Sequence, residues 1–223
     1  MLKLHGFPVS NYANMVHFVL LEKGLAFDYV LRYPDQSEAL LAGSPRGKVP
    51  FLETGDGCIS ETSVILEYLE EAFPDSPRLL PANAHERAYV RALMKEIELY
   101  IELPARACYL EAIFGIPVAE AIRLRAREEL LAGIATLKRH GTFAPYLAGA
   151  QLTLADVVLL YSLDLAVTVG SRQFGLDLLA DFPEARLLLQ RLNALPHART
   201  LAARRDAELP AFVAAVRAKY AHS

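Results

Sequence analysis

Cysteine is scarce in this sequence, which holds Cys58 and Cys108 and no other cysteine among its 223 residues. Two cysteines are too few for the disulfide framework of a small secreted protein. The zinc-site spacings CxxC and HExxH are missing, and none of the six histidines has another one four residues away. We therefore predict that the protein has no metal site. We interpret both cysteines as small buried hydrophobic residues.

Long apolar runs and an excess of basic charge are missing as well. The apolar stretch Val157–Leu163 is bounded by Asp156 and Asp164, so it is too short to cross a bilayer. The 23 basic and 26 acidic residues give a formal net charge of −3, whereas a dedicated nucleic-acid binder needs a basic footprint. The first residues, MLKLHGFP, lack the apolar core of a signal peptide. These features predict a cytoplasmic protein with no nucleic-acid partner and no membrane partner.

The first part of the chain alternates between strand and helix patterns. Its apolar spacing predicts the order β-α-β-α-β-β-α, which is an α/β layer of thioredoxin type. Strands are expected at Leu2–His5, Phe27–Leu31, Val49–Leu52 and Cys58–Ser60. Helices are expected from Asn11 to near Gly24, at Gln36–Ala42, and along the segment that carries Val64, Ile65, Tyr68 and Leu69.

The second part shows helical patterns only, after a proline-bearing linker. Helices are predicted at His85–Tyr109, Pro117–Arg139, Leu154–Val169, Pro183–Ala194 and Ala198–Tyr220. Pro104 should kink or break the first of them, because proline lacks a backbone donor and clashes with the preceding turn. Thr153 and Asp156 have the spacing of a capping box. We expect an α/β domain at 1–76, a linker at 77–85 and an all-helical domain at 86–223.

Three loops of the first part hold residues that can carry chemistry. Ser10 precedes a helix, where its hydroxyl can donate to an anion or act as an ordinary N-cap. Lys48–Pro50 leads into a strand, and a cis bond would turn the backbone of Val49 toward a peptide-like ligand. A proline without a role is the alternative there. Glu61 and Thr62 open a helix and can hold an ammonium and a carboxylate, or simply start the helix. Together the loops indicate a site for a peptide with an amino-acid end group and a thiol.

The whole chain resembles the cytosolic glutathione S-transferases. The matching text is LHGFPVSNYANMVHFVLLEKG, SPRGKVPFLETGDGCISETSVILEYLEE and LTLADVVLL. The resemblance implies a thioredoxin-like N-terminal domain that binds glutathione and an all-α C-terminal domain that contributes the electrophile pocket. It also implies a homodimer, with glutathione as the co-substrate and no metal. The expected enzyme uses the glutathione thiolate to attack a small hydrophobic electrophile.

The resemblance also assigns the donor that stabilises the thiolate. Ser10 falls where serine-type members of the family place this hydroxyl, and it would act as a hydrogen-bond donor without forming a covalent intermediate. Asn11 and Tyr12 are near enough in sequence to supply the donor instead. A free thiol has a pKa of about 8.5, so a donor and a helix N-terminus are needed to favour its anion at neutral pH.

Five further residues would bind glutathione if the resemblance holds residue by residue. Val49 would pair through its backbone with the cysteinyl part, and Pro50 would be cis. Glu61 and Thr62 would hold the γ-glutamyl ammonium and carboxylate. Lys48 occupies a position that often contacts glutathione and can also meet the glycine carboxylate.

Several alternatives stay open at this level. Within the family, the protein can be a glutathione-dependent isomerase of the maleylacetoacetate type or a disulfide or peroxide reductase. The fuller Ser-Ser-Cys loop of that isomerase is replaced here by Ser10-Asn11-Tyr12. A non-catalytic binding or regulatory protein is the alternative of another class. The pocket for the electrophile is expected between the domains, and the pattern leaves Asp164 without a role. Candidate lining residues are Phe7, Tyr12, Tyr100, Tyr109 and Phe114.

Overall fold

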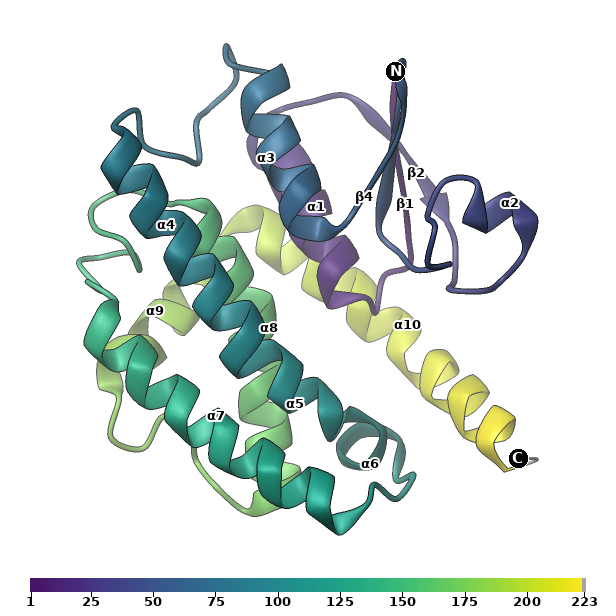
Figure 1. Cartoon of the computed structure of the whole chain (residues 1–223), viewed down its shortest axis with the longest axis vertical. Coiled ribbons are helices and arrows are strands. Elements are labelled where there is room, and N and C mark those ends of the chain that lie inside the picture. The colour runs from purple at the N-terminus through teal and green to yellow at the C-terminus, as the bar shows by residue number, and fades with distance from the viewer. Residues whose placement is uncertain (222–223) are drawn as a thin grey trace. The chain divides into compact units, whose positions relative to one another are not determined.

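The protein is described from a computed structural model that covers residues 1–221 (Figure 1). Its contacts divide the chain into two compact units. The N-terminal unit consists of Met1–Leu79 and Pro196–Glu208, and the helical unit consists of Leu80–Leu195 and the chain from Leu209 onward. The long C-terminal helix α10, Pro196–Tyr220, therefore supplies residues to both units.

The N-terminal unit contains a four-stranded sheet with the strand order β2-β1-β3-β4. Its strands are β1 (Leu2–Gly6), β2 (Phe27–Leu31), β3 (Phe51–Thr54) and β4 (Gly57–Ser60). Its helices are α1 (Asn11–Glu22), α2 (Glu38–Leu41) and α3 (Thr62–Ala72). Strand β1 is parallel to β2 and antiparallel to β3, and β3 is antiparallel to β4. The predicted order of elements and the thioredoxin-like α/β layer are confirmed.

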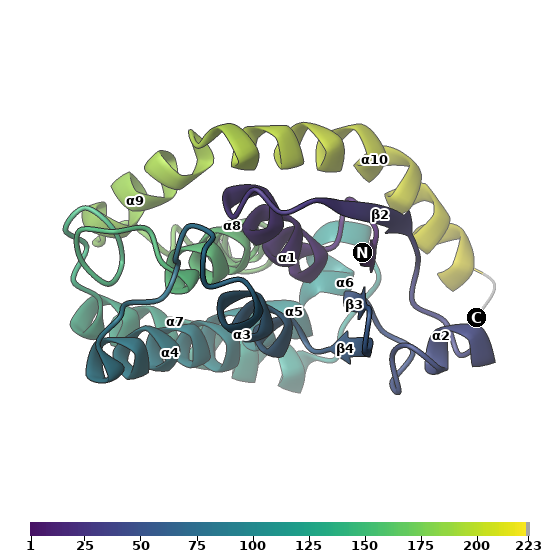
Figure 2. The ribbon, with the colours of Figure 1, turned by 90° about the horizontal axis from the view of Figure 1, so that it is seen from above.

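The alternation of side chains along β1 separates the face of the sheet that packs on α1 and α3 from the opposite face. Leu4 and its register partner Leu52 are fully buried, on the face that contacts the packed helices α1 and α3. Because neighbouring residues of a strand point to opposite sides, Lys3 and His5 lie on the other face. The first half of α10 also belongs to this unit and runs beside β2 (Figure 2). There the Arg204 guanidinium lies 4.6 Å from the centre of the Tyr29 ring.

The helical unit contains helices and one isolated bridge in its described part. Its elements before α10 are α4 (Ala84–Ile97), η1 (Glu98–Glu102), α5 (Leu103–Ala107), α6 (Tyr109–Phe114), α7 (Glu120–His140), α8 (Leu154–Phe174) and α9 (Pro183–Asn193). The chain does not leave the helix at Pro104. A π-helical turn, η1, comes just before it, and Pro104 is the second residue of α5, which continues directly from that turn. The short α6 lies between the predicted helices His85–Tyr109 and Pro117–Arg139, in a segment for which the sequence pattern predicted no helix.

Helix α8 is the core helix of the helical unit. It is long and apolar enough to cross a membrane by length and composition, yet 78% of its most apolar window is buried inside the protein. It starts with the predicted capping box. The Thr153 backbone N–H donates to Asp156 Oδ2 at 2.8 Å, and the Leu147 N–H donates to Asp156 Oδ1 at 2.7 Å. Burial raises the pKa of the Asp156 carboxyl above its usual range, and the hydrogen bonds oppose this shift.

Candidate functional site

The strand register brings the three loops with candidate residues to one end of the sheet, where β1 and β4 finish and β3 begins. His5 of β1 pairs with Phe51 of β3, which pairs in turn with Ser60 of β4. Because these strands alternate in direction, the end of β1, the start of β3 and the end of β4 lie side by side. The candidate residues that follow or precede those positions therefore lie at this end of the sheet: Ser10, Lys48, Val49, Pro50, Glu61 and Thr62.

Ser10 is the N-cap of α1, and this role leaves its hydroxyl hydrogen available. The side-chain oxygen accepts a hydrogen bond from the Ala13 N–H at 3.2 Å. The backbone N–H of Ser10 donates to the carbonyl of Phe7 at 3.0 Å. The cap uses a lone pair of the hydroxyl oxygen, so the O–H remains free to donate to an anion at the start of the helix. Asn11 and Tyr12 lie half-buried in the same turn.

The loop before β3 presents Val49 outside the strand ladder. The Val49–Pro50 peptide bond is cis, as the resemblance implies, and the ladder begins one residue later at Phe51. The loop itself depends on Gly47, which has a φ of +61°. A Cβ built on Gly47 would lie 2.0 Å from the carbonyl oxygen of Asp35, so only glycine fits there. Lys48 next to it is exposed.

Glu61 has a backbone conformation that residues other than glycine rarely adopt. Its φ is +71° and its ψ is 118°. It stands at the N-cap position of α3, but its side chain makes no capping hydrogen bond there. Such backbone strain costs of the order of 1–3 kcal/mol and clusters at ligand sites. The exposed carboxylate of Glu61 and the half-buried Thr62 thus stand at the amino end of α3, where the helix dipole favours an anion.

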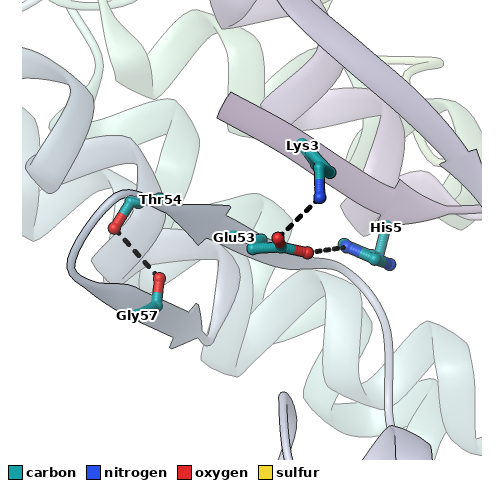
Figure 3. Close-up of polar contacts among 5 residues, drawn as sticks. All are labelled: Lys3, His5, Glu53, Thr54 and Gly57. Atoms are coloured by element: carbon teal, nitrogen blue, oxygen red, sulfur yellow. Dashed lines mark hydrogen bonds and ion pairs between the residues drawn. The ribbon is translucent and has the colours of Figure 1, made fainter. Parts of the chain in front are cut away.

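A polar cluster on the face of the sheet opposite α1 and α3 was not foreseen from the sequence (Figure 3). Glu53 of β3 accepts from Lys3 Nζ at 2.7 Å and contacts His5 Nε2 at 3.2 Å. The His5 ring stacks on Phe51 with 4.0 Å between ring centres. Burial lowers the pKa of His5 despite the opposing effect of Glu53, while hydrogen bonds from Lys3 and His5 lower the pKa of Glu53. The alternation of Lys3 and His5 along β1 could have indicated a polar face, but not its partner on β3.

The same view shows why the hairpin after β3 is well defined. The Thr54 hydroxyl donates to the Gly57 carbonyl at 2.9 Å across the turn (Figure 3). The Asp56 N–H donates back to the Thr54 oxygen at 3.1 Å. These bonds fix the pairing of β3 with β4, and that pairing sets where Glu61 emerges relative to the loop of Val49.

The two cysteines differ in their environments. Cys108 is buried, as predicted, but the same prediction is wrong for Cys58, which is exposed. Cys58 lies on the edge strand β4 as the register partner of Glu53. Its side chain therefore points to the same face as Glu53, away from the core between the sheet and the helices α1 and α3. Burial raises the pKa of both thiols, and the negative charge of Glu53 adds to the effect at Cys58. Neither thiol is poised as a thiolate. Among residues 1–221, no three side chains of His, Cys, Asp or Glu form a group that could hold a metal ion.

Comparisons with known proteins identify both halves of the chain. The family model "Glutathione S-transferase, N-terminal domain" matches residues 4–77, and the model "Glutathione S-transferase, C-terminal domain" matches residues 119–191. A "Glutathione S-transferase" from Pseudomonas putida is 56% identical over 217 residues, which are 97% of this chain and 98% of that protein. A "Probable maleylacetoacetate isomerase" from Vibrio cholerae is 31% identical over 69% of this chain and 70% of its own length.

Solved structures give the same result at the level of the fold. Glutathione transferase F2 from Populus trichocarpa matches with a TM-score of 0.80 at 20% identity, over 93% of this chain and 100% of that chain. A glutathione S-transferase from Rhodospirillum rubrum matches with a TM-score of 0.71 at 29% identity, over 90% of this chain and 91% of that one. Together with the full-length relative at 56% identity, these matches show that the chain belongs to the glutathione S-transferase family and is a transferase enzyme.

Proposed function

We propose that this enzyme activates the thiol of glutathione through the Ser10 hydroxyl, so that the glutathione thiolate attacks a small hydrophobic electrophile and forms a bond from its sulfur to that molecule. The observation that carries the proposal is the state of Ser10. Its oxygen caps α1 by accepting from Ala13, while its hydrogen can donate to a thiolate at the positive end of a helix of 12 residues. Both effects favour the anion, and each unit by which the thiol pKa falls corresponds to about 1.4 kcal/mol.

The rest of the tripeptide lies along this end of the sheet. The backbone of Val49, next to cis-Pro50, supplies an N–H and a carbonyl for the cysteinyl part, in the way that an added strand pairs with an edge. The amides at the start of α3 and the Thr62 hydroxyl bind the γ-glutamyl carboxylate. Glu61, whose side chain makes no capping hydrogen bond, binds the ammonium. Lys48 is the last of the residues that we propose to contact glutathione.

Ser10→Ala tests the activation step. The pKa of bound glutathione, measured from thiolate absorbance against pH, should rise by about one unit or more, and turnover should fall about tenfold to a hundredfold. Calorimetry checks that glutathione still binds. Ser37→Ala is the matched control, because Ser37 caps α2 in the same manner, with its oxygen accepting from Leu40. A Ser10→Ala protein with the thiol pKa of the parent would remove Ser10 from the mechanism, and Tyr12→Phe and Asn11→Ala would then be the variants to measure.

A second reaction class uses the same thiolate. One relative over 69% of the chain is named a probable maleylacetoacetate isomerase, and isomerisation begins with the same attack of sulfur on an electrophilic carbon. In that case the sulfur leaves again and glutathione is recovered unchanged. Conjugation consumes one glutathione per product, so the ratio of glutathione consumed to substrate converted separates the two reactions.

We further propose that the enzyme is a homodimer. On the helical unit, η1 and the start of α5 expose apolar side chains of Leu99 (45%), Tyr100 (53%) and Leu103 (45%). Adjacent exposed apolar residues are typical of interaction surfaces. Sedimentation equilibrium should give twice the mass of the chain. The cytoplasm is the compartment we propose, since the apolar helix α8 is a core element and the two cysteines are free thiols.

A further inference from the structure

A buried amide side chain of helix α1 is tied to the loop that carries Ser10. Asn14 is 3% exposed and lies one turn into α1, within a run of buried residues from Ala13 to Leu20. Its Nδ2 donates to the backbone carbonyl of Pro8 at 2.8 Å in a buried hydrogen bond. Asparagine is a weak helix former, and its amide costs free energy to bury without a partner. Its bond to the loop therefore explains a polar residue at this apolar position.

Pro8 lies in a tight turn between β1 and α1. The Ser10 N–H donates to the Phe7 carbonyl at 3.0 Å, which closes a four-residue turn with Pro8 and Val9 at its centre. Proline favours the first central position because its ring fixes φ. The peptide unit between the two central residues takes no part in the closing bond, and a flip of that unit by about 180° converts one common turn type into another. Its orientation must therefore be fixed from outside the turn.

Asn14 fixes this central peptide unit of the turn. The carbonyl that it binds is the oxygen of the Pro8–Val9 peptide. Residues 6–9 are all buried, and a buried carbonyl that loses its donor is costly because water does not replace it. The bond from Asn14 thus selects one orientation of the turn, and Ser10 is the residue with which the turn ends.

The backbone of Asn14 is joined to Ser10 as well. The Asn14 N–H donates to the Ser10 carbonyl at 3.0 Å, while the Ser10 hydroxyl oxygen accepts from the neighbouring Ala13 N–H at 3.2 Å. Asn14 therefore binds the turn at Pro8 through its side chain and at Ser10 through its backbone. Only the side-chain bond depends on the type of residue, so a substitution can remove it and leave the helical bond in place.

Close packing of α1 on β1 fixes the two ends of this turn. A Cβ built on Gly6, the last residue of β1, would lie 2.7 Å from the Cβ of Ala13. The start of the helix thus packs directly against the end of the strand. A hydrogen-bond donor in a catalytic site has to be held within about 0.5 Å of its productive position by locked neighbours. The packing of Gly6 on Ala13 and the bond from Asn14 to Pro8 together supply that restraint for Ser10.

We propose that Asn14 is a positioning residue for the reaction, because it holds the Pro8–Val9 peptide and so keeps the Ser10 hydroxyl directed at the thiolate of glutathione. This inference rests on the proposed function, since it assumes that Ser10 is the donor. Asn14 is buried and acts only through Ser10. A purely structural Asn14 would stabilise the N-terminal unit without any influence on the bound thiol, so the two roles differ in what a substitution changes.

Asn14→Leu tests the proposal, because leucine favours a helix and lacks the amide donor. The pKa of bound glutathione, measured from thiolate absorbance against pH, should rise by about half a unit. The turnover number kcat should fall about threefold to tenfold, while the dissociation constant of glutathione, measured by calorimetry, should change less than about twofold. His17→Leu is the matched control, because His17 is a buried polar residue further along the same helix whose ring stacks on Tyr29. That control should keep the thiol pKa of the parent.

A double variant separates positioning from general stability. In a protein that already carries Ser10→Ala, Asn14→Leu should cause no further rise in the thiol pKa and no further loss of kcat, because Asn14 acts through the hydroxyl that is then missing. If Asn14→Leu does not fold, as judged by circular dichroism, Asn14→Ala gives the same comparison, since it adds no atoms and leaves only a cavity.

Three results would overturn the inference. They are the thiol pKa of the parent in Asn14→Leu, an equal rise of that pKa in His17→Leu, and additive effects of the two substitutions in the double variant. The proposed function has a separate test: if Ser10→Ala leaves the thiol pKa unchanged, Ser10 is not the donor. A rise in Ser10→Ala without one in Asn14→Leu contradicts only the role of Asn14.

Discussion

At the scale of single residues, a buried ion pair secures the N-terminal unit. Lys23 at the end of α1 has a fully buried side chain, and its Nζ lies 2.7 Å from Glu70 of α3, which is 7% exposed. Lys23 also donates to the Pro77 carbonyl at 3.0 Å, and the Leu79 N–H donates to Glu70 at 3.0 Å. The pair thus joins two helices to the segment that leaves the unit. Lys23 shows no special pattern in the sequence, because its partner is 47 residues away.

Lys23→Met should lower the free energy of unfolding by about 3–5 kcal/mol, because it leaves a buried carboxylate without its ammonium. Urea unfolding followed by circular dichroism measures the change. Lys3→Met is the matched control: it removes the half-exposed pair of Lys3 with Glu53, and it should cost far less because solvent screens such a pair. Equal costs for the two variants would show that burial of the Lys23 pair has no special weight.

At the scale of elements, the first half of α10 meets α1 and β2 through His17. Its ring stacks on Tyr29 with 5.0 Å between centres, and Arg204 Nη1 lies 3.3 Å from His17 Nδ1. Burial, and then the charge of Arg204, lowers the pKa of His17 from 6.5 to about 4. Between these two values the unfolded chain binds a proton that the native protein does not. This histidine therefore makes stability fall as the pH drops through that window.

The expected loss is about 3 kcal/mol on going from pH 7 to below pH 4, with little change from this group above pH 7. Urea midpoints at a series of pH values measure it. His17→Gln should remove this part of the slope, so the difference between parent and variant isolates the contribution of His17 from that of the other groups that titrate in this range. Parallel curves for the two proteins would contradict the assignment.

Among the elements, those with local patterns were predictable from the sequence. Strand β2 has the predicted bounds, and the capping box of α8 was legible because both of its members lie within four residues. The π-helical turn η1 was not, since it depends on packing between distant segments. A Cβ on Gly133 of α7 would lie 2.1 Å from the carbonyl oxygen of Tyr100 in η1. That close approach is set by tertiary contact, and periodicity within one helix carries no trace of it.

At the scale of the whole molecule, motif residues and contact residues differ in how far they can be foreseen. The loops of Ser10, Val49 and Glu61 stand out because each combines a helix start or a proline with a polar group. Lys3, His5 and Glu53 come together only through the register of β1 with β3. Register depends on which strands become neighbours, so a single sequence did not indicate that these three residues form a cluster.

Ligand binding should couple the proposed site to the stability of the protein. A ligand that binds only the folded state, at a hundred times its dissociation constant, stabilises it by about 2.7 kcal/mol. Glutathione should therefore raise the melting temperature of the parent protein by several degrees. Glu61→Ala should lose most of this gain at the same glutathione concentration, because the ammonium loses its carboxylate. Glu71→Ala is the matched control, since Glu71 is an exposed glutamate near the opposite end of the same helix. If Glu61→Ala shows the full rise in melting temperature, the γ-glutamyl end binds elsewhere. Glutathione would then cross this end of the sheet in another direction.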